Sequence, residues 1–177
     1  MRIAALLLAL FLSACSRPGW HMTDISGSMP RLAFDLGGVK ADQFRGKVVA
    51  LYFGYTHCPD VCPATLANLT EMLGKVNSPD VRVLFVTVDP ARDTDAVLAD
   101  YARAFSPQVV GLRGADNQLA ALARTYRVAY SVKAGPPYEV MHSNAVFFFD
   151  RDGKARLVTT DTSDTAGMAE DVKKLIR

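Results

Sequence analysis

The sequence predicts an α/β protein with a mixed β-sheet, because segments of strand character alternate with segments of helical character. Two apolar runs rich in β-branched residues, at 47–53 and 81–88, are typical of strands buried on both faces of a sheet. Two further strands joined by a short turn, within 144–159, predict an antiparallel hairpin. A closing helix is expected at 165–176. Parallel and antiparallel strands in one sheet, flanked by helices, account for this order.

The other elements follow from local signals. Residues 32–39 predict a small N-terminal β-hairpin, because a Gly-Gly pair stands at its turn. A helix is expected from Pro63, since Leu66, Leu69 and Met72 recur at helical spacing and proline suits a first helical turn. The remaining elements are expected, in chain order, as a turn at 42–46, a helix at 95–105, a strand at 109–112, a helix at 117–126 and a strand at 129–132.

Composition excludes several classes of protein. The chain has 177 residues, of which 50% are hydrophobic and 21% charged, so one globular domain is expected rather than a disordered chain. The net charge is only +2 and no long basic run occurs, which argues against nucleic-acid binding. There is no glycine-rich phosphate loop and no Gly-x-Ser-x-Gly elbow, so neither nucleotide binding nor serine hydrolysis is supported.

The N-terminus has the pattern of a secretory signal. Met1 and Arg2 precede about ten apolar residues, a stretch too short to span a bilayer. The sequence then reads Leu-Ser-Ala-Cys and resembles a bacterial lipobox, in which the thiol of Cys15 is acylated. An ordinary signal peptide with a coincidental cysteine is the alternative. We therefore predict a lipoprotein signal peptide at 1–14, a polar tether at 15–29 and a folded domain at 30–177, attached to a membrane facing an oxidising compartment.

Cys58 and Cys62 stand in the segment HCPDVCP, between a predicted buried strand and a predicted helix. Unpaired N–H groups and the helix dipole at a helix start stabilise thiolates. The pair could form a disulfide, act as a redox couple or hold a thiophilic metal, while two inert buried cysteines are the plainest alternative. A closed zinc site normally needs four ligands, whereas two thiolates and one imidazole suit Cu(I) better.

Three histidines could complete such a site. His57 adjoins Cys58, but a residue next to a ligand often points away from the site. His142 precedes the strand at 144–149, where a loop would cross the end of the sheet, although a loop histidine with one hydrogen bond is the plainer interpretation. His21 lies in the predicted tether and is expected to be solvated. Met141 would point opposite to His142 in an extended segment, which predicts a core position for it.

Two motifs carry a resemblance to a known family. The segment GYTHCPDVCPATL at 54–66 and the segment VDPARDT at 88–94 resemble the signature of the Sco/SenC copper chaperones. The segment FRGKVVALYF, the single histidine before NAVFFFDRDG and the tethered N-terminus also match, so the resemblance covers about residues 20–177. It implies a thioredoxin-like fold and copper held by Cys58, Cys62 and His142, as Cu(I) with three ligands or as Cu(II) with a fourth.

The resemblance also implies a function. Such a protein would be a membrane-tethered copper chaperone rather than an enzyme, facing the periplasm in the bacterial cell envelope. It would receive copper from donor proteins and help to assemble the copper site of cytochrome c oxidase subunit II or of another periplasmic copper protein. In the alternative, Cys58 and Cys62 form a catalytic thiol–disulfide pair that reduces the cysteines of such partners and cycles through a Cys58–Cys62 disulfide.

Two positions qualify the resemblance. Asp89 matches the aspartate of the family's Asp-Pro pair and could tune the site or contact a partner, while capping of the following helix is an equally good interpretation. Met141 stands where the family usually has an aspartate beside the ligand histidine. The missing carboxylate could change the orientation or basicity of His142, because the partners of a metal ligand tune it.

Overall fold

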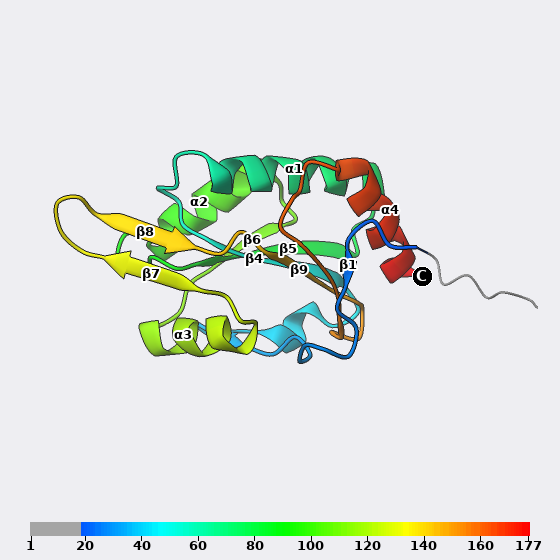
Figure 1. The fold of residues 1–177 in the computed structure, drawn as a ribbon, viewed down its shortest axis with the longest axis horizontal. Helices are drawn as coiled ribbons and strands as arrows, with labels where there is room; N and C mark the ends of the chain where they lie inside the picture. The colour runs from blue at the N-terminus through cyan, green and yellow to red at the C-terminus, as the bar shows by residue number, and fades with distance from the viewer. Residues whose placement is uncertain (1–18) are drawn as a thin grey trace, which may run out of the picture.

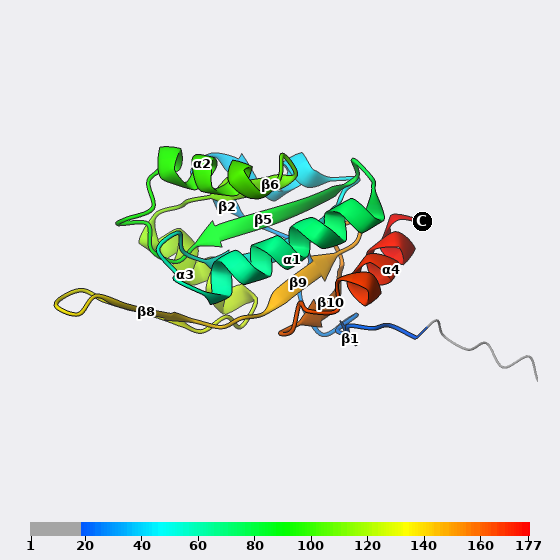
Figure 2. The same ribbon diagram turned by 90° about the horizontal axis from the view of Figure 1, so that it is seen from above.

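A six-stranded mixed sheet lies between two layers of helices in the computed structural model, which describes residues 19–177 (Figures 1 and 2). The strands of the sheet follow the order β1-β10-β9-β4-β5-β6. The helices and strands are β1 (Thr23–Asp24), β2 (Asp35–Leu36), β3 (Val39–Lys40), the 3₁₀ helix η1 (Ala41–Phe44), β4 (Val48–Gly54), α1 (Val61–Val76), β5 (Val81–Thr87), α2 (Asp95–Phe105), β6 (Val109–Leu112), α3 (Asp116–Thr125), β7 (Tyr130–Lys133), β8 (Glu139–His142), β9 (Val146–Phe149), β10 (Ala155–Thr159) and α4 (Thr165–Ile176).

The two apolar runs form the centre of the sheet. β4 pairs with β5 in parallel, and β5 pairs with β6 in parallel, whereas β9 runs antiparallel to both β4 and β10. Every residue of β4 is buried, as expected for a strand covered on both faces. The prediction of an α/β protein with a mixed sheet is confirmed.

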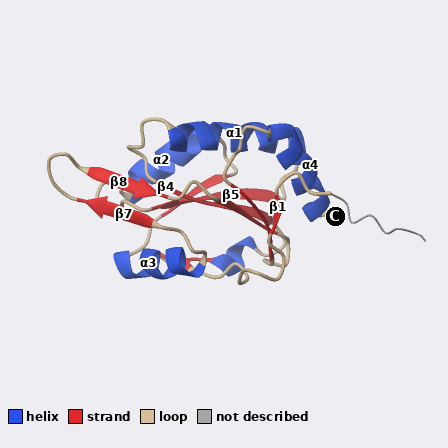
Figure 3. Cartoon of the chain, viewed as in Figure 1, coloured by secondary structure: helices blue, strands red, loops and turns tan. Residues whose placement is uncertain are grey.

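Successive residues of β4 serve two separate cores. Val48 and Ala50 pack under α1, α2 and α4 on one face of the sheet. Val49 and Leu51 point to the other face, where α3 and the β2–β3 hairpin cover them. Figure 3 shows α1, α2 and α4 on one side of the strands and α3 on the other. The predicted N-terminal hairpin is present, with Leu36 paired to Val39.

The first described residues belong to the folded domain. β1 pairs with β10, Met22 is buried, and Trp20 packs against the core. The buried carboxylate of Asp171 accepts hydrogen bonds from the backbone N–H groups of His21 and Met22, at 2.8 and 2.9 Å. Packing thus begins within the stretch that the sequence assigns to a tether.

The predicted signal peptide and the lipidation site at Cys15 lie outside the described residues. Within residues 19–177, no helix is both long and apolar enough to cross a membrane.

A two-stranded ribbon, which we call the arm, projects from one end of the domain (Figure 1). The arm consists of β7, β8 and the loop between them, and its strands pair with each other rather than with the main sheet. The sequence predicts β7 but not β8. The core position predicted for Met141 is wrong, since its side chain is 70% exposed. The alternation holds: Val140 and His142 are partly buried, whereas Glu139 and Met141 are exposed, because the outer face of the arm is open to solvent.

Candidate metal centre

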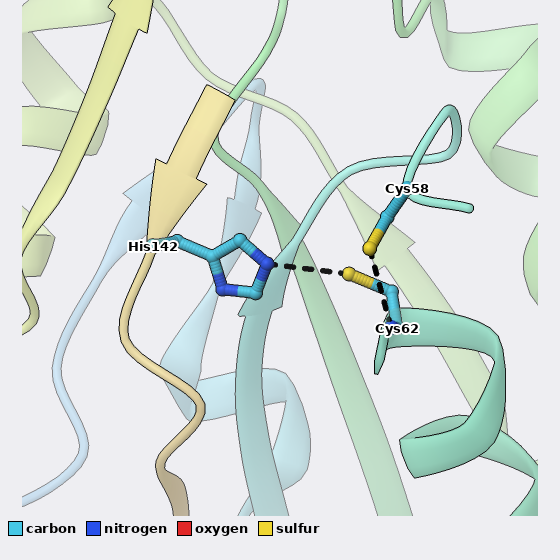
Figure 4. A group of neighbouring side chains, drawn as sticks. All are labelled: Cys58, Cys62 and His142. Atoms are coloured by element: carbon cyan, nitrogen blue, oxygen red, sulfur yellow. Dashed lines mark hydrogen bonds between the residues drawn. The ribbon is translucent and has the colours of Figure 1, made fainter. Parts of the chain in front are cut away.

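Two thiols and one imidazole converge where β4 ends, α1 begins and the arm returns to the body. One ligand atom each from Cys58, Cys62 and His142 lies within 4.8 Å of the others (Figure 4). Cys58 comes from the loop after β4, Cys62 from the first turn of α1 and His142 from the last position of β8. Among residues 19–177, no other group of three or more His, Cys, Asp or Glu side chains is this close.

The strand–helix junction places the two sulfurs together. α1 begins at Val61, two residues before the predicted start, so Cys62 lies in its first turn. Asp60 precedes the helix, but its side chain makes no capping hydrogen bond. The unpaired N–H of Cys62 instead donates to the Sγ of Cys58 at 3.4 Å. The helix start therefore stabilises negative charge on Cys58, as its position in the sequence predicts.

Gly54 makes room for the second sulfur. A Cβ at this position would lie 2.5 Å from Cε2 of Phe85 and 2.9 Å from the Sγ of Cys62, closer than real Cβ contacts. Both neighbours are fully buried, so neither can turn into solvent. The glycine at the end of β4 therefore lets the Cys62 thiol reach the strand end.

The two thiols differ in acidity. Burial pushes the pKa of Cys58 upward, but hydrogen bonds from the backbone and thiol of Cys62 and from the backbone of Asp60 outweigh it, so this pKa lies below its ordinary value. Burial raises the pKa of Cys62 to about 12. Cys58 is only partly buried, whereas Cys62 is fully buried, and both are free thiols in this structure. Cys58 is thus the more reactive of the two.

The imidazole of His142 presents one nitrogen to the thiols. Its Nε2 lies 3.3 Å from the Sγ of Cys62, and its Nδ1 lies 3.0 Å from the carbonyl oxygen of Ser143. A carbonyl can only accept, so Nδ1 carries the proton and the lone pair of Nε2 faces the thiols. Burial lowers the pKa of His142, which favours the neutral, ligating form. The ring also meets Tyr52 and Tyr55 edge-on, with centroids 6.1 and 5.8 Å apart.

The missing carboxylate at position 141 bears on this geometry. The side chain of residue 141 leaves the opposite face of β8 from His142. The backbone carbonyl of Ser143 already holds the Nδ1 proton, a role often filled by a carboxylate or carbonyl beside a ligating histidine. The orientation of the ring in this structure therefore does not depend on the residue at position 141.

The other predicted candidates lie outside the cluster. His57 points away, as expected from its place beside Cys58, and its half-exposed ring lies near Thr56 and Asp93. His21 lies on the surface beside α4, where its Nε2 is 3.0 Å from a carboxylate oxygen of Glu170. Asp89 does not cap α2, because the hydroxyl of Thr94 accepts the N–H of Val97 there.

Asp89 instead lies buried near the arm. Its carboxylate accepts hydrogen bonds from the hydroxyl of Tyr138, at 2.8 Å, and from the guanidinium of Arg92, at 2.5 Å. Within residues 19–177 it is not among the groups that could ligate a metal.

Sequence reasoning missed a second buried carboxylate. Asp93 is fully buried and accepts hydrogen bonds from the N–H and hydroxyl of Thr56 and from the hydroxyl of Thr87. These bonds fix the start of the loop that carries Cys58. An aspartate within an Asp-Thr pair before a helix has the pattern of a cap, so no local signal indicated this role.

The donor set indicates the kind of ion that fits. Two thiolates and one imidazole are soft ligands, and three donors fall short of the four of a closed zinc site. Cu(I) accepts such a set. The same two thiols could also be oxidised to a disulfide or attack one in a partner, since exchange requires only an accessible thiolate and a second thiol that resolves the mixed disulfide.

Comparison with known proteins shows that this chain is similar in sequence to one family. A model of the SCO1/SenC family matches residues 33–177. The bovine protein named "Protein SCO2 homolog, mitochondrial" is 43% identical over 147 residues, which are 78% of this chain and 53% of that protein. A SCO2-like protein from Rickettsia felis is 35% identical over 120 residues, 64% of this chain and 58% of that protein. The chain spans about half the length of the curated relatives it matches.

Solved structures match the fold as well. Copper-bound ScoI from Arabidopsis thaliana has a TM-score of 0.75 and 32% identity, covering 83% of this chain and 98% of that one. Apo Sco1 from Thermus thermophilus has a TM-score of 0.73 and 34% identity, covering 89% and 99%. These neighbours are thioredoxin-like, so the predicted fold class is confirmed.

Proposed function

Because this chain belongs to the SCO1/SenC family, we propose that it binds copper through Cys58, Cys62 and His142 and delivers it to a copper protein. The observation that carries the proposal is the convergence of these three side chains, two of them 80 residues apart in sequence, on one point of the fold. The copper site of cytochrome c oxidase subunit II is the proposed destination, or that of another periplasmic protein, and donor proteins supply the copper.

The site would take up Cu(I) with its own three ligands. Nε2 of His142 already offers a lone pair, whereas both thiols must lose their protons on binding. The pKa of Cys62, about 12, means that copper must displace a proton there at neutral pH. Affinity for copper should therefore fall as the pH falls, since protons then compete more strongly. Cu(II) would need a fourth ligand, for which water would serve.

We also propose that the chain is a lipoprotein anchored at Cys15 and facing the periplasm. The support is the sequence pattern at 1–15, which precedes the described residues. The described residues begin at 19, with Trp20 and Met22 packed on the domain.

Thiol–disulfide exchange is the second candidate function, and one observation favours it. Cys58 is accessible and has a lowered pKa, while Cys62 is buried with a raised pKa. This asymmetry suits a pair in which the Cys58 thiolate attacks a partner disulfide. The sulfur of Cys62 would then attack the mixed disulfide, so that the partner leaves reduced and a Cys58–Cys62 disulfide forms.

A competition titration with a Cu(I) chelator tests the primary proposal. We would use the reduced protein carrying Cys15→Ser, so that two thiols remain, beside His142→Ala and the matched control His57→Ala. We expect one tightly bound Cu(I) per chain, weakened at least about tenfold by loss of the His142 ligand and unchanged by His57→Ala. Absence of tight binding, or equal affinity in the His142 variant, would overturn the three-ligand site and favour thiol exchange.

A further inference from the structure

The third ligand sits on an element that the main sheet does not hold. His142 ends β8, and β8 pairs only with β7 in a separate two-stranded sheet. Figures 1 and 2 show the arm extending beyond the end of the domain. A two-stranded hairpin of four-residue strands is marginally stable by itself. The position of His142 therefore depends on what fastens the arm to the body.

The base of the arm is closed by local hydrogen bonds. The N–H of Ser143 donates to the carbonyl of Ala129 at 2.9 Å, and the N–H of Ala129 donates to the hydroxyl of Ser143 at 3.0 Å. These bonds join the two strands to each other. They do not tie the arm to the loops around the thiols.

Tyr138, the residue before β8, makes a polar tie to one of those loops, in addition to the packing of Tyr130 and Val140 against the core. Its hydroxyl donates to Oδ1 of Asp89 at 2.8 Å, across 49 residues of sequence. Asp89 is only 1% exposed and lies in the loop after β5, next to the sheet end that carries the site. A hydrogen bond to an ionised carboxylate is among the stronger ones, and a buried carboxylate that loses a partner is penalised further.

Arg92 completes the contact. Its Nε donates to Oδ2 of Asp89, and its guanidinium lies 4.0 Å from the centre of the Tyr138 ring, within the range of a cation–π interaction. The same guanidinium lies 5.8 Å from the centre of the Tyr55 ring, which meets the ring of His142 edge-on. The contact that fastens the arm is thus continuous with the packing around the ligand.

We infer that Tyr138, Asp89 and Arg92 form a latch that holds the arm against the body and thereby sets how fast copper leaves the site. The three are positioning residues, because none offers an atom to the ligand cluster. Opening the latch would carry Nε2 of His142 away and leave the metal on two thiolates, open to a ligand from a partner. The copper part of this inference rests on the proposed function, whereas the mechanical part does not.

Amide hydrogen exchange of the metal-free protein tests the mechanical part. Tyr138→Phe removes only the hydroxyl, and Tyr130→Phe is the matched control, since the Tyr130 hydroxyl has no hydrogen-bond partner among residues 19–177. We expect amides of β7 and β8 to exchange about tenfold faster in Tyr138→Phe, with no change in α1 or β5. Equal exchange of the arm in the two variants would overturn the latch.

Release of Cu(I) to an excess of bathocuproine disulfonate tests the functional part. We expect release about tenfold faster in Tyr138→Phe and unchanged in Tyr130→Phe. In a His142→Ala background the effect of Tyr138→Phe should vanish, because the latch acts only through that ligand. An equal acceleration in both backgrounds would overturn the inference. If the unaltered protein binds no copper, the proposed function fails, and the exchange measurement still decides whether the latch exists.

Discussion

Gly54→Ala adds a single methyl group to the chain, at the place where β4 meets the Cys62 thiol. The added carbon would sit 2.5 Å from Cε2 of Phe85 and 2.9 Å from the Sγ of Cys62, whereas ordinary contacts begin near 3.4 Å. Both neighbours are fully buried, and Phe85 also packs against the ring of Tyr52 at 5.9 Å. Relief therefore requires the strand, the ring or the first turn of α1 to shift.

The size of the expected loss of stability follows from overpacking of the core. Forcing one extra carbon into a well-packed core typically destabilises a protein by about 1–3 kcal/mol. The two contacts here fall well inside the ordinary range, so we expect about 2–3 kcal/mol. Any shift of the first turn of α1 would also move Sγ of Cys62 relative to Nε2 of His142, which now lie 3.3 Å apart.

Urea denaturation measures the effect, with Gly74→Ala as the matched control. Gly74 lies inside α1, and a Cβ there would meet no atom within 4 Å. Alanine exceeds glycine in helix propensity, so this control should gain about 0.5–1 kcal/mol. With a slope of about 2 kcal/mol per molar urea, the midpoint should fall by about 1 M for Gly54→Ala and rise by a few tenths for Gly74→Ala.

The two glycines thus predict opposite signs for the same substitution. A midpoint for Gly54→Ala equal to that of the unaltered protein would refute the steric argument. It would show that the end of β4 relaxes at little cost and that Gly54 is not what lets Cys62 approach the strand.

Two further predictions concern the thiols and the N-terminal strand. With iodoacetamide at pH 7.5, Cys58 should react at least about tenfold faster than Cys62, because the pKa of Cys58 lies below its ordinary value and that of Cys62 is raised. Unfolding in urea should remove the difference. Peptide mass spectrometry showing equal rates in the folded protein would contradict this. Asp171→Ala should lower the free energy of unfolding by about 3 kcal/mol, because two backbone N–H groups lose their buried acceptor. The control Glu170→Ala removes an exposed carboxylate and should change the free energy of unfolding by less than about 1 kcal/mol. A urea midpoint that is the same for both variants would be evidence against the role of Asp171.

Regular elements were predictable from sequence where one pattern dominated. The apolar runs of β4 and β5 and the helical spacing of Leu66, Leu69 and Met72 correspond to elements within two residues of their predicted bounds. The helices at 95–105 and 165–176 have the predicted bounds. In these segments local propensity and burial pattern agree, so no distant contact was needed to decide them.

β8 escaped prediction because its pattern depends on the rest of the fold. β8 is a four-residue segment that closely follows a Pro-Pro pair, begins with a charged residue and ends with a histidine. Such a segment carries little strand signal by itself. They become a strand by pairing with β7, and the arm then faces solvent on one side. That exposure also explains the error at Met141, where a large apolar side chain was expected inside.

The candidate site likewise has one part that local sequence predicts and another part that depends on tertiary contacts. The spacing of Cys58 and Cys62 at a strand–helix junction predicts two adjacent sulfurs from local geometry. His142 lies eighty residues later; its place before a strand made it a candidate, but the choice over a plain loop histidine came from the family resemblance. The contacts of Gly54, the bonds of Asp93 to Thr56 and the bond of Tyr138 to Asp89 are tertiary as well, so the residues involved look unremarkable in sequence.

The pairing of β1 with β10 gives the domain a direction. The first described residues leave the sheet at one end, beside the C-terminus, while the thiols, His142 and the arm occupy the other (Figures 1 and 2). Whatever precedes residue 19 therefore joins the molecule at the pole remote from its reactive groups. A force applied at that attachment would act on β1 and on the hydrogen bonds of Asp171 before it reached the site. A partner could approach the opposite pole head-on, without meeting the point at which the preceding segment joins the domain.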